Sequence, residues 1–466
     1  MNADAELPEA ESSEDETLAR HKRMAEVLGG ERRMGWADWK DMSISESTCL
    51  TQDGQRVALW AVDVLQRVLK DDFLSRVEDW QKRMQEKNPD VKLEMHPIFS
   101  LGFWPTNDVP WVYANLIRLA ANIQLFILES KSHPNRVKDV LKTLHDNLEP
   151  ISWVSTLLQL EVAGLGRKAG WQIQFEPQYP TGKKSDVHLI NGPTDLLVET
   201  TLMRKSVAER KALAFFERLA RHLDQLGWQH NVRISGSLKG ASLENAEAVV
   251  QWLQAIEENA RAAAHDGQVR LVPGPAEMHV EVFRPTEATV GEPWGVEGDP
   301  IETNPLNRLL ILLQDKNSQA ERSVTPVWVR LNETAGLWQC TRFQGMTLAQ
   351  TLTFLTDFLQ EKFLSLFPNL AGVILSTGAL WSGGAPLDAL VERAKYNGSI
   401  ALRNSVPVDH CRETIIIPRP GVSNSGAEVF ADWYIHEDTW LDWALNELGH
   451  PSFNVLIQEP LKENGL

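Results

Sequence analysis

Two stretches of sequence decide the fold: LLQLEVAGLGRKAGWQIQFEP at 157–177 and KKSDVHLINGPTDLLVETT at 183–201. The first is apolar at its start and predicts a helix over 151–168, with Ser152 as a candidate cap. A glycine then ends the helix, and the segment WQIQF at 171–175 alternates between large apolar and polar side chains, as a strand does. The first stretch therefore predicts a helix followed directly by a strand.

The second stretch predicts two strands joined by a tight turn. The strands are expected at 186–190 and 196–202, and the dipeptide Asn191-Gly192 between them is a strong hairpin signal. The later strand is mostly apolar, which is typical of a strand buried on both faces. A helix followed by three strands, two of them in a tight hairpin, is the most specific pattern in the chain.

Downstream of this pattern, helical and strand-like segments alternate. Such alternation predicts an α/β sheet that is at least partly parallel. The helices are expected at 206–226, 243–264, 305–320, 347–366 and 437–448. The strands are expected at 232–237, twice within 268–284, and at 326–331, 370–376 and 413–417.

Upstream of Pro150 the periodicity is helical throughout, with helices expected at 56–87, 111–131 and 135–148. The composition therefore divides the chain into four parts. These are a disordered acidic tail at 1–20, an α-helical domain at 21–150, an α/β domain at 151–420 with an elaboration at about 206–300, and a C-terminal helical segment at 421–466.

The hairpin carries the residues that could perform chemistry. Side chains alternate between the two faces of a strand, so the hairpin can set Asp186 beside Glu199. Two neighbouring carboxylates repel each other unless something neutralises them, and carboxylate oxygens suit Mg²⁺ or Mn²⁺. Glu161 lies in the apolar helix and is a candidate third contributor. The alternatives are exposed acids at strand ends and, for Glu161, a structural salt bridge.

The two stretches resemble the core of the PD-(D/E)XK nuclease superfamily, whose fold is a restriction-endonuclease-like mixed sheet flanked by helices. The match aligns Glu161 with the helix glutamate, Asp186 with the metal-binding aspartate and Glu199 with the second carboxylate. LLILLQDKNSQ at 309–319, followed by PVWVRL at 326–331, resembles the helix and strand after the motif. The resemblance covers roughly 150–420. It implies a Mg²⁺ or Mn²⁺ cofactor and phosphodiester hydrolysis, and many bacterial members belong to mobile-element or phage-defence systems.

The chain departs from the superfamily at one position. Thr201 stands where the motif has its lysine, and a threonine hydroxyl cannot supply a positive charge. Lys184, two residues before Asp186, is the expected replacement, with Lys205 and Lys316 as second choices. His188, two residues beyond Asp186, is a candidate general base.

Basic residues crowd this part of the chain and could hold phosphates, the alternative being a solvated helix face of mixed charge. The expected substrate-binding residues are Lys183, Arg204, Lys205, Lys316 and Gln319. Further basic residues follow at Arg210, Lys211, Arg218 and Arg221, with acidic residues interleaved.

The overall composition and net charge of the chain exclude some classes of function. A net charge of −17 argues against tight non-specific nucleic-acid binding by the whole surface, though not against a local basic patch. The three cysteines are far apart and form no zinc motif. No apolar segment could span a bilayer and no targeting signal occurs, so a cytoplasmic protein without a membrane partner is expected.

Two hypotheses follow from the sequence. The first is a metal-dependent nuclease acting on DNA or RNA, with the helical N-terminal domain recognising substrate or a protein partner. The second is a catalytically degenerate nuclease fold that serves as a binding scaffold, for which the missing lysine is the sequence mark. Metal affinity and the convergence of the three carboxylates distinguish the two.

Overall fold

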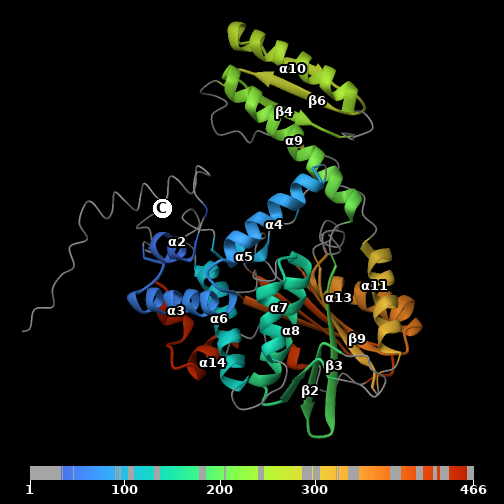
Figure 1. Ribbon diagram of the computed structural model, residues 1–466. Coiled ribbons are helices and arrows are strands. Elements are labelled where there is room, and N and C mark those ends of the chain that lie inside the picture. The colour runs from blue at the N-terminus through green and yellow to red at the C-terminus, as the bar shows by residue number, and fades with distance from the viewer. Residues whose placement is uncertain are drawn as a thin grey trace, which may run out of the picture. The chain divides into compact units, whose positions relative to one another are not determined.

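The computed structural model is a mixed α/β structure with two sheets (Figure 1). No helix among the described residues is long and apolar enough to cross a membrane. The acidic tail at 1–20 lies outside the described part of the chain. The structure describes residues 33, 35–45, 47–89, 91, 93, 96–102, 110–130, 137–177, 185–203, 206–239, 246–285, 296–297, 305–321, 323, 325–333, 346–377, 390–405, 413–422, 428–430 and 440–458.

The chain divides into two compact units, each with its own sheet and its own hydrophobic core. The second unit comprises Lys82–Glu94 and Arg204–Pro305, and the first unit takes the remainder. The segment expected as an elaboration at about 206–300 thus falls in a unit of its own. The helical segments before 150 and after 420 belong to the same unit as the large sheet, so the composition boundaries do not coincide with the boundaries between compact units.

The first unit is built on an eight-stranded mixed sheet in the order β1-β2-β3-β8-β9-β12-β11-β10. The strands β3, β8 and β9 run parallel, and every other neighbouring pair is antiparallel. The partly parallel α/β sheet expected from the alternating pattern is confirmed, but the strands β10 and β11 had no counterpart in the sequence analysis. The bounds are Gln172–Phe175 (β1), Val187–Asn191 (β2), Thr194–Met203 (β3), Val327–Glu333 (β8), Leu370–Thr377 (β9), Leu390–Tyr396 (β10), Ser399–Ser405 (β11) and Glu413–Pro418 (β12).

The predicted hairpin forms between β2 and β3. Asn191 pairs with Thr194, so the turn residues are Gly192 and Pro193 rather than Asn191-Gly192. Gly192 has φ +59°, a conformation that a glycine adopts without strain at the first position of a two-residue turn. The turn fixes the register, in which Val187 lies opposite Val198.

The helix α8 (Pro150–Lys168) covers one face of the sheet. Its cap is Glu149, whose side chain accepts a hydrogen bond from the Ser152 amide at 3.0 Å, so the expected cap at Ser152 is wrong. Pro150 has no amide hydrogen to satisfy and therefore fits the first turn. Gly166 allows close packing, because a Cβ at this position would lie 2.6 Å from a Leu189 methyl group of β2.

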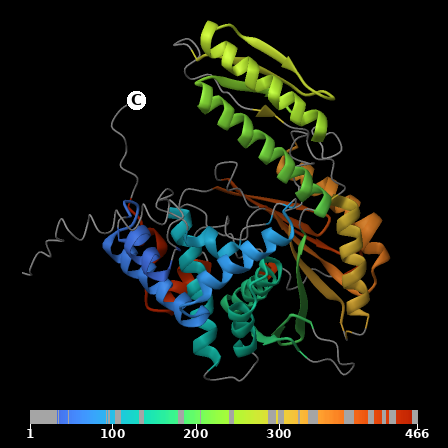
Figure 2. The ribbon, with the colours of Figure 1, turned by 45° about the horizontal axis from the view of Figure 1, so that its top comes forward.

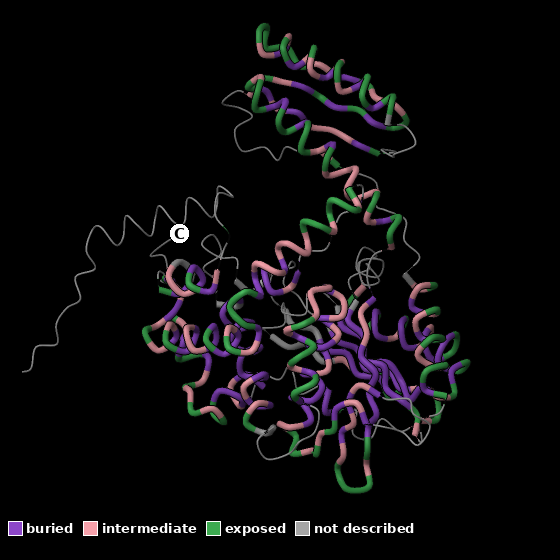
Figure 3. The backbone as a smooth tube through the Cα atoms, in the orientation of Figure 1, coloured by how far each residue is buried: buried purple, intermediate pink, exposed green. Residues whose placement is uncertain are grey.

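The helices α11 (Pro305–Ala320) and α13 (Leu348–Phe358) cover the opposite face. Their leucines pack against Val329 and Leu331 of β8, which alternate with residues that point toward α8. The expected single helix at 347–366 is wrong beyond Phe358, where a π-helical turn (η4, Leu359–Phe363) and a 3₁₀ turn (η5, Leu364–Leu366) follow. Both faces of the parallel strands are therefore buried, which explains their apolar sequences (Figure 3).

The remaining helices of the first unit, with residues 73–81 of α4, share one hydrophobic cluster with α8 and the sheet. The expected helix at 56–87 is wrong, because the chain breaks at Lys70, whose φ of +74° no helix interior tolerates. An isolated antiparallel bridge pairs Leu50 with Ile457, which are far apart in the sequence. The bounds are Trp36–Asp38 (α2), Trp39–Ile44 (η1), Gln52–Leu69 (α3), Phe73–Lys87 (α4), Pro97–Gly102 (α5), Pro110–Ser130 (α6), Val137–Asp146 (α7), Trp440–Glu447 (α14) and Phe453–Leu456 (α15).

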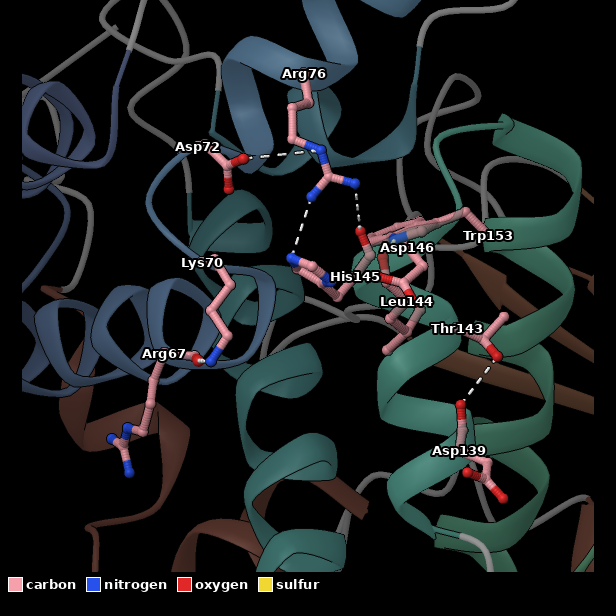
Figure 4. A network of polar contacts seen from close by, with 10 residues as sticks. All are labelled: Arg67, Lys70, Asp72, Arg76, Asp139, Thr143, Leu144, His145, Asp146 and Trp153. Atoms are coloured by element: carbon pink, nitrogen blue, oxygen red, sulfur yellow. Dashed lines mark hydrogen bonds and ion pairs between the residues drawn. The ribbon is translucent and has the colours of Figure 1, made fainter.

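A polar network joins the start of α4 to the end of α7 (Figure 4). Arg76 contacts His145 through the ring Nε2 at 3.1 Å and donates to its carbonyl oxygen at 3.3 Å. His145 also contacts Asp146 at 2.6 Å, and the Trp153 indole donates to the Leu144 carbonyl at 3.1 Å. These bonds satisfy carbonyl groups at the end of α7, which the helix itself leaves without donors.

The second unit packs two helices, α9 (Val207–His230) and α10 (Ala246–Asp266), against a four-stranded sheet (Figure 2). Its strand order is β5-β6-β4-β7. The buried strand residues alternate with exposed ones and share one cluster with the leucines of α9. The strands are Arg233–Ser237 (β4), Arg270–Pro273 (β5), His279–Phe283 (β6) and Val296–Glu297 (β7).

Candidate functional site

Asp186 lies immediately before β2, one residue beyond the pair of Val187 with Val198. Its Oδ2 accepts two hydrogen bonds from Thr200 of β3, one from the amide at 2.7 Å and one from the hydroxyl at 2.8 Å. Thr200 is itself buried and lies within 3.3 Å of the Ser155 hydroxyl of α8. The Asp186 carboxylate is therefore held against β3 by both the backbone and a side chain.

Glu199, the neighbour of Thr200 along β3, points to the other face of the sheet. Its Oε2 accepts a hydrogen bond from Lys316 of α11 at 3.0 Å, and the two side chains are 10% and 15% exposed. A charge-assisted bond of this kind is stronger than a neutral one where water is mostly excluded. Lys316 therefore brings a positive charge to the strand that lacks the motif lysine.

The charges around Asp186 act in opposite directions. Burial raises the pKa of Asp186 above its ordinary value, and the negative charge of Glu176 adds to the rise. The hydrogen bonds from Thr200 and the positive charge of Lys316 lower the same pKa, but by less than burial raises it. Asp186 thus takes a proton more readily than an exposed aspartate, and Lys316 is close enough to affect its charge.

Glu161 belongs to a different environment. It projects from α8 and forms an ion pair with Arg330 of β8 at 3.0 Å, with side-chain exposures of only 5% and 2%. Arg330 also donates to the Ser376 hydroxyl at 2.7 Å and to the Leu331 carbonyl at 3.1 Å. The Ser376 hydroxyl in turn donates to Asn332 at 2.9 Å. The result is a buried polar network on the α8 face.

The register shows why the carboxylates separate. In the parallel pairing of β3 with β8, Thr200 lies beside Arg330 and Glu199 lies beside Val329. Thr200 and Arg330 therefore face α8, whereas Glu199 faces α11. In the described part of the chain, no group of three or more acidic, histidine or cysteine residues could hold a metal ion. The expected three-carboxylate cluster does not form: Lys316 bonds Glu199 and its charge also acts on Asp186, whereas Glu161 pairs with Arg330.

The other sequence candidates have varied positions. Lys183, Lys184, Arg204 and Lys205 lie outside the described residues. Gln319 is exposed on α11, and Thr201 is half-buried on β3. The candidate base His188 contacts Asp195 of the same hairpin at 3.1 Å.

Sequence analysis missed Thr200 and the network around Arg330. A signal was available for the network, because Arg330 and Ser376 interrupt apolar strands and a polar group buried in a strand needs a partner. No comparable signal marked Thr200, since threonine is an ordinary strand residue. Its contact with Asp186 depends on the hairpin register.

Asp186 and Glu199 carry only oxygen atoms as potential metal ligands. Asp186 and Glu199 offer oxygen ligands from two side chains, and Asp186 keeps its Oδ1 outside the hydrogen bonds from Thr200. Mg²⁺ is often held by one or two carboxylates, with water and substrate phosphate as its other ligands, whereas structural Zn²⁺ requires four protein ligands. The two carboxylates and the lysine do not supply the four protein ligands of a structural zinc site.

We define the Asp186 cluster as Asp186, Thr200, Glu199 and Lys316. Thr200 bonds Asp186, Lys316 bonds Glu199, and the charge of Lys316 also acts on Asp186. Comparison of the chain with family models, with curated proteins and with solved structures gave no match.

Proposed function

We propose that the chain hydrolyses phosphodiester bonds of DNA or RNA at the Asp186 cluster, on a restriction-endonuclease-like fold. The observation that carries the proposal is the 3.0 Å contact between Lys316 and Glu199, with both side chains largely shielded from water. The contact puts a lysine beside the second carboxylate although Thr201 occupies the motif position. The lysine comes from α11 instead of β3.

Each residue of the cluster has a chemical task in this proposal. Asp186 and Glu199 would hold a divalent cation, which supplies Lewis acidity and lowers the pKa of bound water. Lys316 would offset negative charge that develops on the phosphate during attack by water. Thr200 would keep Asp186 in one orientation, since both of its donors engage the same carboxylate oxygen.

A cleavage assay tests the proposal. The purified chain is incubated with plasmid, single-stranded DNA and RNA in Mg²⁺ and in Mn²⁺, beside the variants Asp186→Ala, Lys316→Met and Asp195→Ala. Asp195→Ala is the matched control, because Asp195 is an exposed carboxylate of the same hairpin that contacts only His188 among the described residues. Cleavage by the wild type and by Asp195→Ala, lost in the other two variants, is the expected result.

A second function is favoured by a specific observation. Each of the three motif carboxylates already has a protein donor, and the pair of Glu161 with Arg330 is nearly inaccessible to solvent. Saturated, buried acids are what a degenerate nuclease fold acting as a binding scaffold would retain. Titration calorimetry with Mn²⁺ separates the two functions: heat of binding that Asp186→Ala abolishes supports hydrolysis, and its absence in the wild type supports the scaffold.

A further inference from the structure

Ser155 lies on α8 and turns its hydroxyl toward the sheet. Its Oγ is 3.3 Å from the hydroxyl oxygen of Thr200 on β3, and among the described residues this is the one hydrogen bond of the Ser155 side chain. Thr200 in turn bonds the carboxylate of Asp186. Side-chain hydrogen bonds thus connect the helix, through the strand, to the residue that precedes β2.

The direction of the Ser155 hydroxyl differs from that of other hydroxyls on the helices of this chain. A serine or threonine within a helix commonly donates to the carbonyl oxygen one turn earlier. Thr143, Thr156, Ser318 and Thr353 do so, at 2.9 to 3.0 Å. In the described part of the chain, Ser155 bonds a strand and not its own helix.

The Thr200 hydroxyl has one proton and two acceptors within reach. Asp186 Oδ2 lies at 2.8 Å and the Ser155 carbonyl oxygen at 3.3 Å. The shorter distance and the negative charge of the carboxylate favour Asp186, because charge-assisted hydrogen bonds are the stronger ones. The Thr200 oxygen then keeps its lone pairs for a donor, and the Ser155 hydroxyl lies within 3.3 Å. The protons therefore run from Ser155 through Thr200 to Asp186.

Removal of the Ser155 hydroxyl would weaken this order. The Ser155 carbonyl oxygen would remain as an acceptor, so the Thr200 proton could turn away from Asp186. Asp186 would then keep only the bond from the Thr200 amide, and one bond allows a carboxylate to rotate. Hydrogen bonds in a chain also polarise one another, so the Ser155 bond strengthens the next one.

We propose that Ser155 is a positioning residue for Asp186: its hydroxyl directs the Thr200 proton to Oδ2 and so holds the carboxylate in one orientation. Ser155 acts only through Thr200. The orientation of Asp186 does not depend on the proposed hydrolysis, whereas the consequence for metal binding rests on the proposed function.

NMR of the full chain without metal tests the orientation through the amide proton of Thr200. This amide donates to the same Oδ2 at 2.7 Å, so its chemical shift depends on where the carboxylate lies. In Ser155→Ala the proton moves upfield, because a rotating carboxylate spends less time in the bond. Ser155→Thr restores a hydroxyl and returns the wild-type shift. With Asp186 already released in Thr200→Val, adding Ser155→Ala causes no further change.

Titration calorimetry with Mn²⁺ tests the consequence for metal binding. Loss of a residue that orients a metal ligand commonly weakens affinity by at least tenfold, so Thr200→Val is expected to bind Mn²⁺ about tenfold more weakly. Ser155→Ala weakens it about threefold, because the hydroxyl acts one bond further away. The double variant binds no more weakly than Thr200→Val alone.

Ser152 supplies the matched control. It lies one turn earlier on α8, is half-buried like Ser155, and its hydroxyl bonds Glu149 at 2.7 Å. Ser152→Ala removes a hydroxyl of the same helix without changing the contact with Thr200. The Thr200 amide shift and the Mn²⁺ affinity therefore stay at their wild-type values. Circular dichroism verifies that all variants are folded.

Two outcomes would overturn the proposal. These are a Thr200 amide shift that is the same in Ser155→Ala and the wild type, and an effect of Ser155→Ala that adds in full to that of Thr200→Val. A shift that moves in Ser155→Ala while the wild type binds no Mn²⁺ leaves Ser155 in its positioning role and removes the hydrolytic function. Mn²⁺ binding by the wild type with an unmoved shift does the reverse.

Discussion

Two ion pairs on opposite faces of the same strands show how alike residues acquire different roles. The pair of Glu161 with Arg330 is sealed under α8, where Arg330 has three acceptors and exposures are 2% and 5%. The pair of Glu199 with Lys316 lies under α11 with exposures of 10% and 15%. A sealed and fully bonded pair maintains the fold, whereas the pair of Glu199 with Lys316 keeps some access to water.

The largest expected effect comes from breaking the sealed pair. Arg330→Met leaves the buried Glu161 carboxylate without compensation, so the free energy of unfolding falls by about 3–5 kcal/mol. Urea denaturation followed by circular dichroism measures the loss. The double variant Glu161→Leu/Arg330→Met recovers most of it, because the unpaired charge is gone. If the double variant is as unstable as Arg330→Met, the unpaired Glu161 carboxylate is not the cause of the lost stability. Lys395→Met, in an exposed pair with Glu428, is the control.

A smaller effect is expected when the pair of Glu199 with Lys316 loses its lysine. Lys316→Met lowers the free energy of unfolding by about 1–3 kcal/mol, because Glu199 loses its donor but keeps some access to water. In the same variant, cleavage falls to the level of Asp186→Ala if the proposed function holds. A loss of stability equal to that of Arg330→Met would remove the distinction between the two pairs.

The next prediction concerns the hydrogen bond from the Thr200 hydroxyl to Asp186. Thr200→Val keeps the shape of the side chain and the amide donor but removes the hydroxyl that bonds Asp186. The free energy of unfolding falls by about 1–2 kcal/mol, and the pKa of Asp186 rises further. Thr200→Ser, which restores a hydroxyl, is the control. Carboxyl-carbon NMR titration measures the pKa, and an unchanged value in Thr200→Val would contradict the assigned bond.

The mildest effect is a dependence on pH. Because burial raises the pKa of Asp186 in the folded state, the folded chain binds this proton more tightly than the unfolded chain does. The stabilising contribution is complete below the unfolded pKa of about 4 and is lost as the pH rises through the folded pKa. Asp186→Asn removes this dependence, so the variant gains stability relative to the wild type as the pH rises. Urea denaturation across a pH series measures the difference, and a difference that shrinks with rising pH would contradict the direction.

Much of the fold around the hairpin was predictable, since its signals are local. The alternation of apolar residues and the Gly192 turn set β2 and β3, and the helix expected at 305–320 has the observed bounds of α11. The failures have two causes, one in the local backbone and one in strand pairing. Lys70 breaks a continuous helical pattern through a backbone conformation that no sequence rule for lysine predicts. The strands β10 and β11 depend on pairing with each other and with β12.

The candidate site was predictable only in part. Asp186 and Glu199 were identified because hairpin pairing follows from sequence separation and turn type. Lys316 was a second choice behind Lys184, because the distance from α11 to β3 is not encoded in any local pattern. For Glu161 the sequence left two alternatives open, a third site carboxylate and a structural salt bridge, and the structure shows the salt bridge with Arg330. Its position on a helix does not reveal which strand it contacts.

By itself, the sequence determined the hairpin, its two carboxylates and the apolar strands that flank it, because these features depend on neighbours along the chain. Only the tertiary structure decided which carboxylate meets which cation. The parallel pairing of β3 with β8 sets Thr200 beside Arg330 and Glu199 beside Val329. Since adjacent strand residues point to opposite faces, this one register sends Glu161 to Arg330 and leaves Glu199 for Lys316.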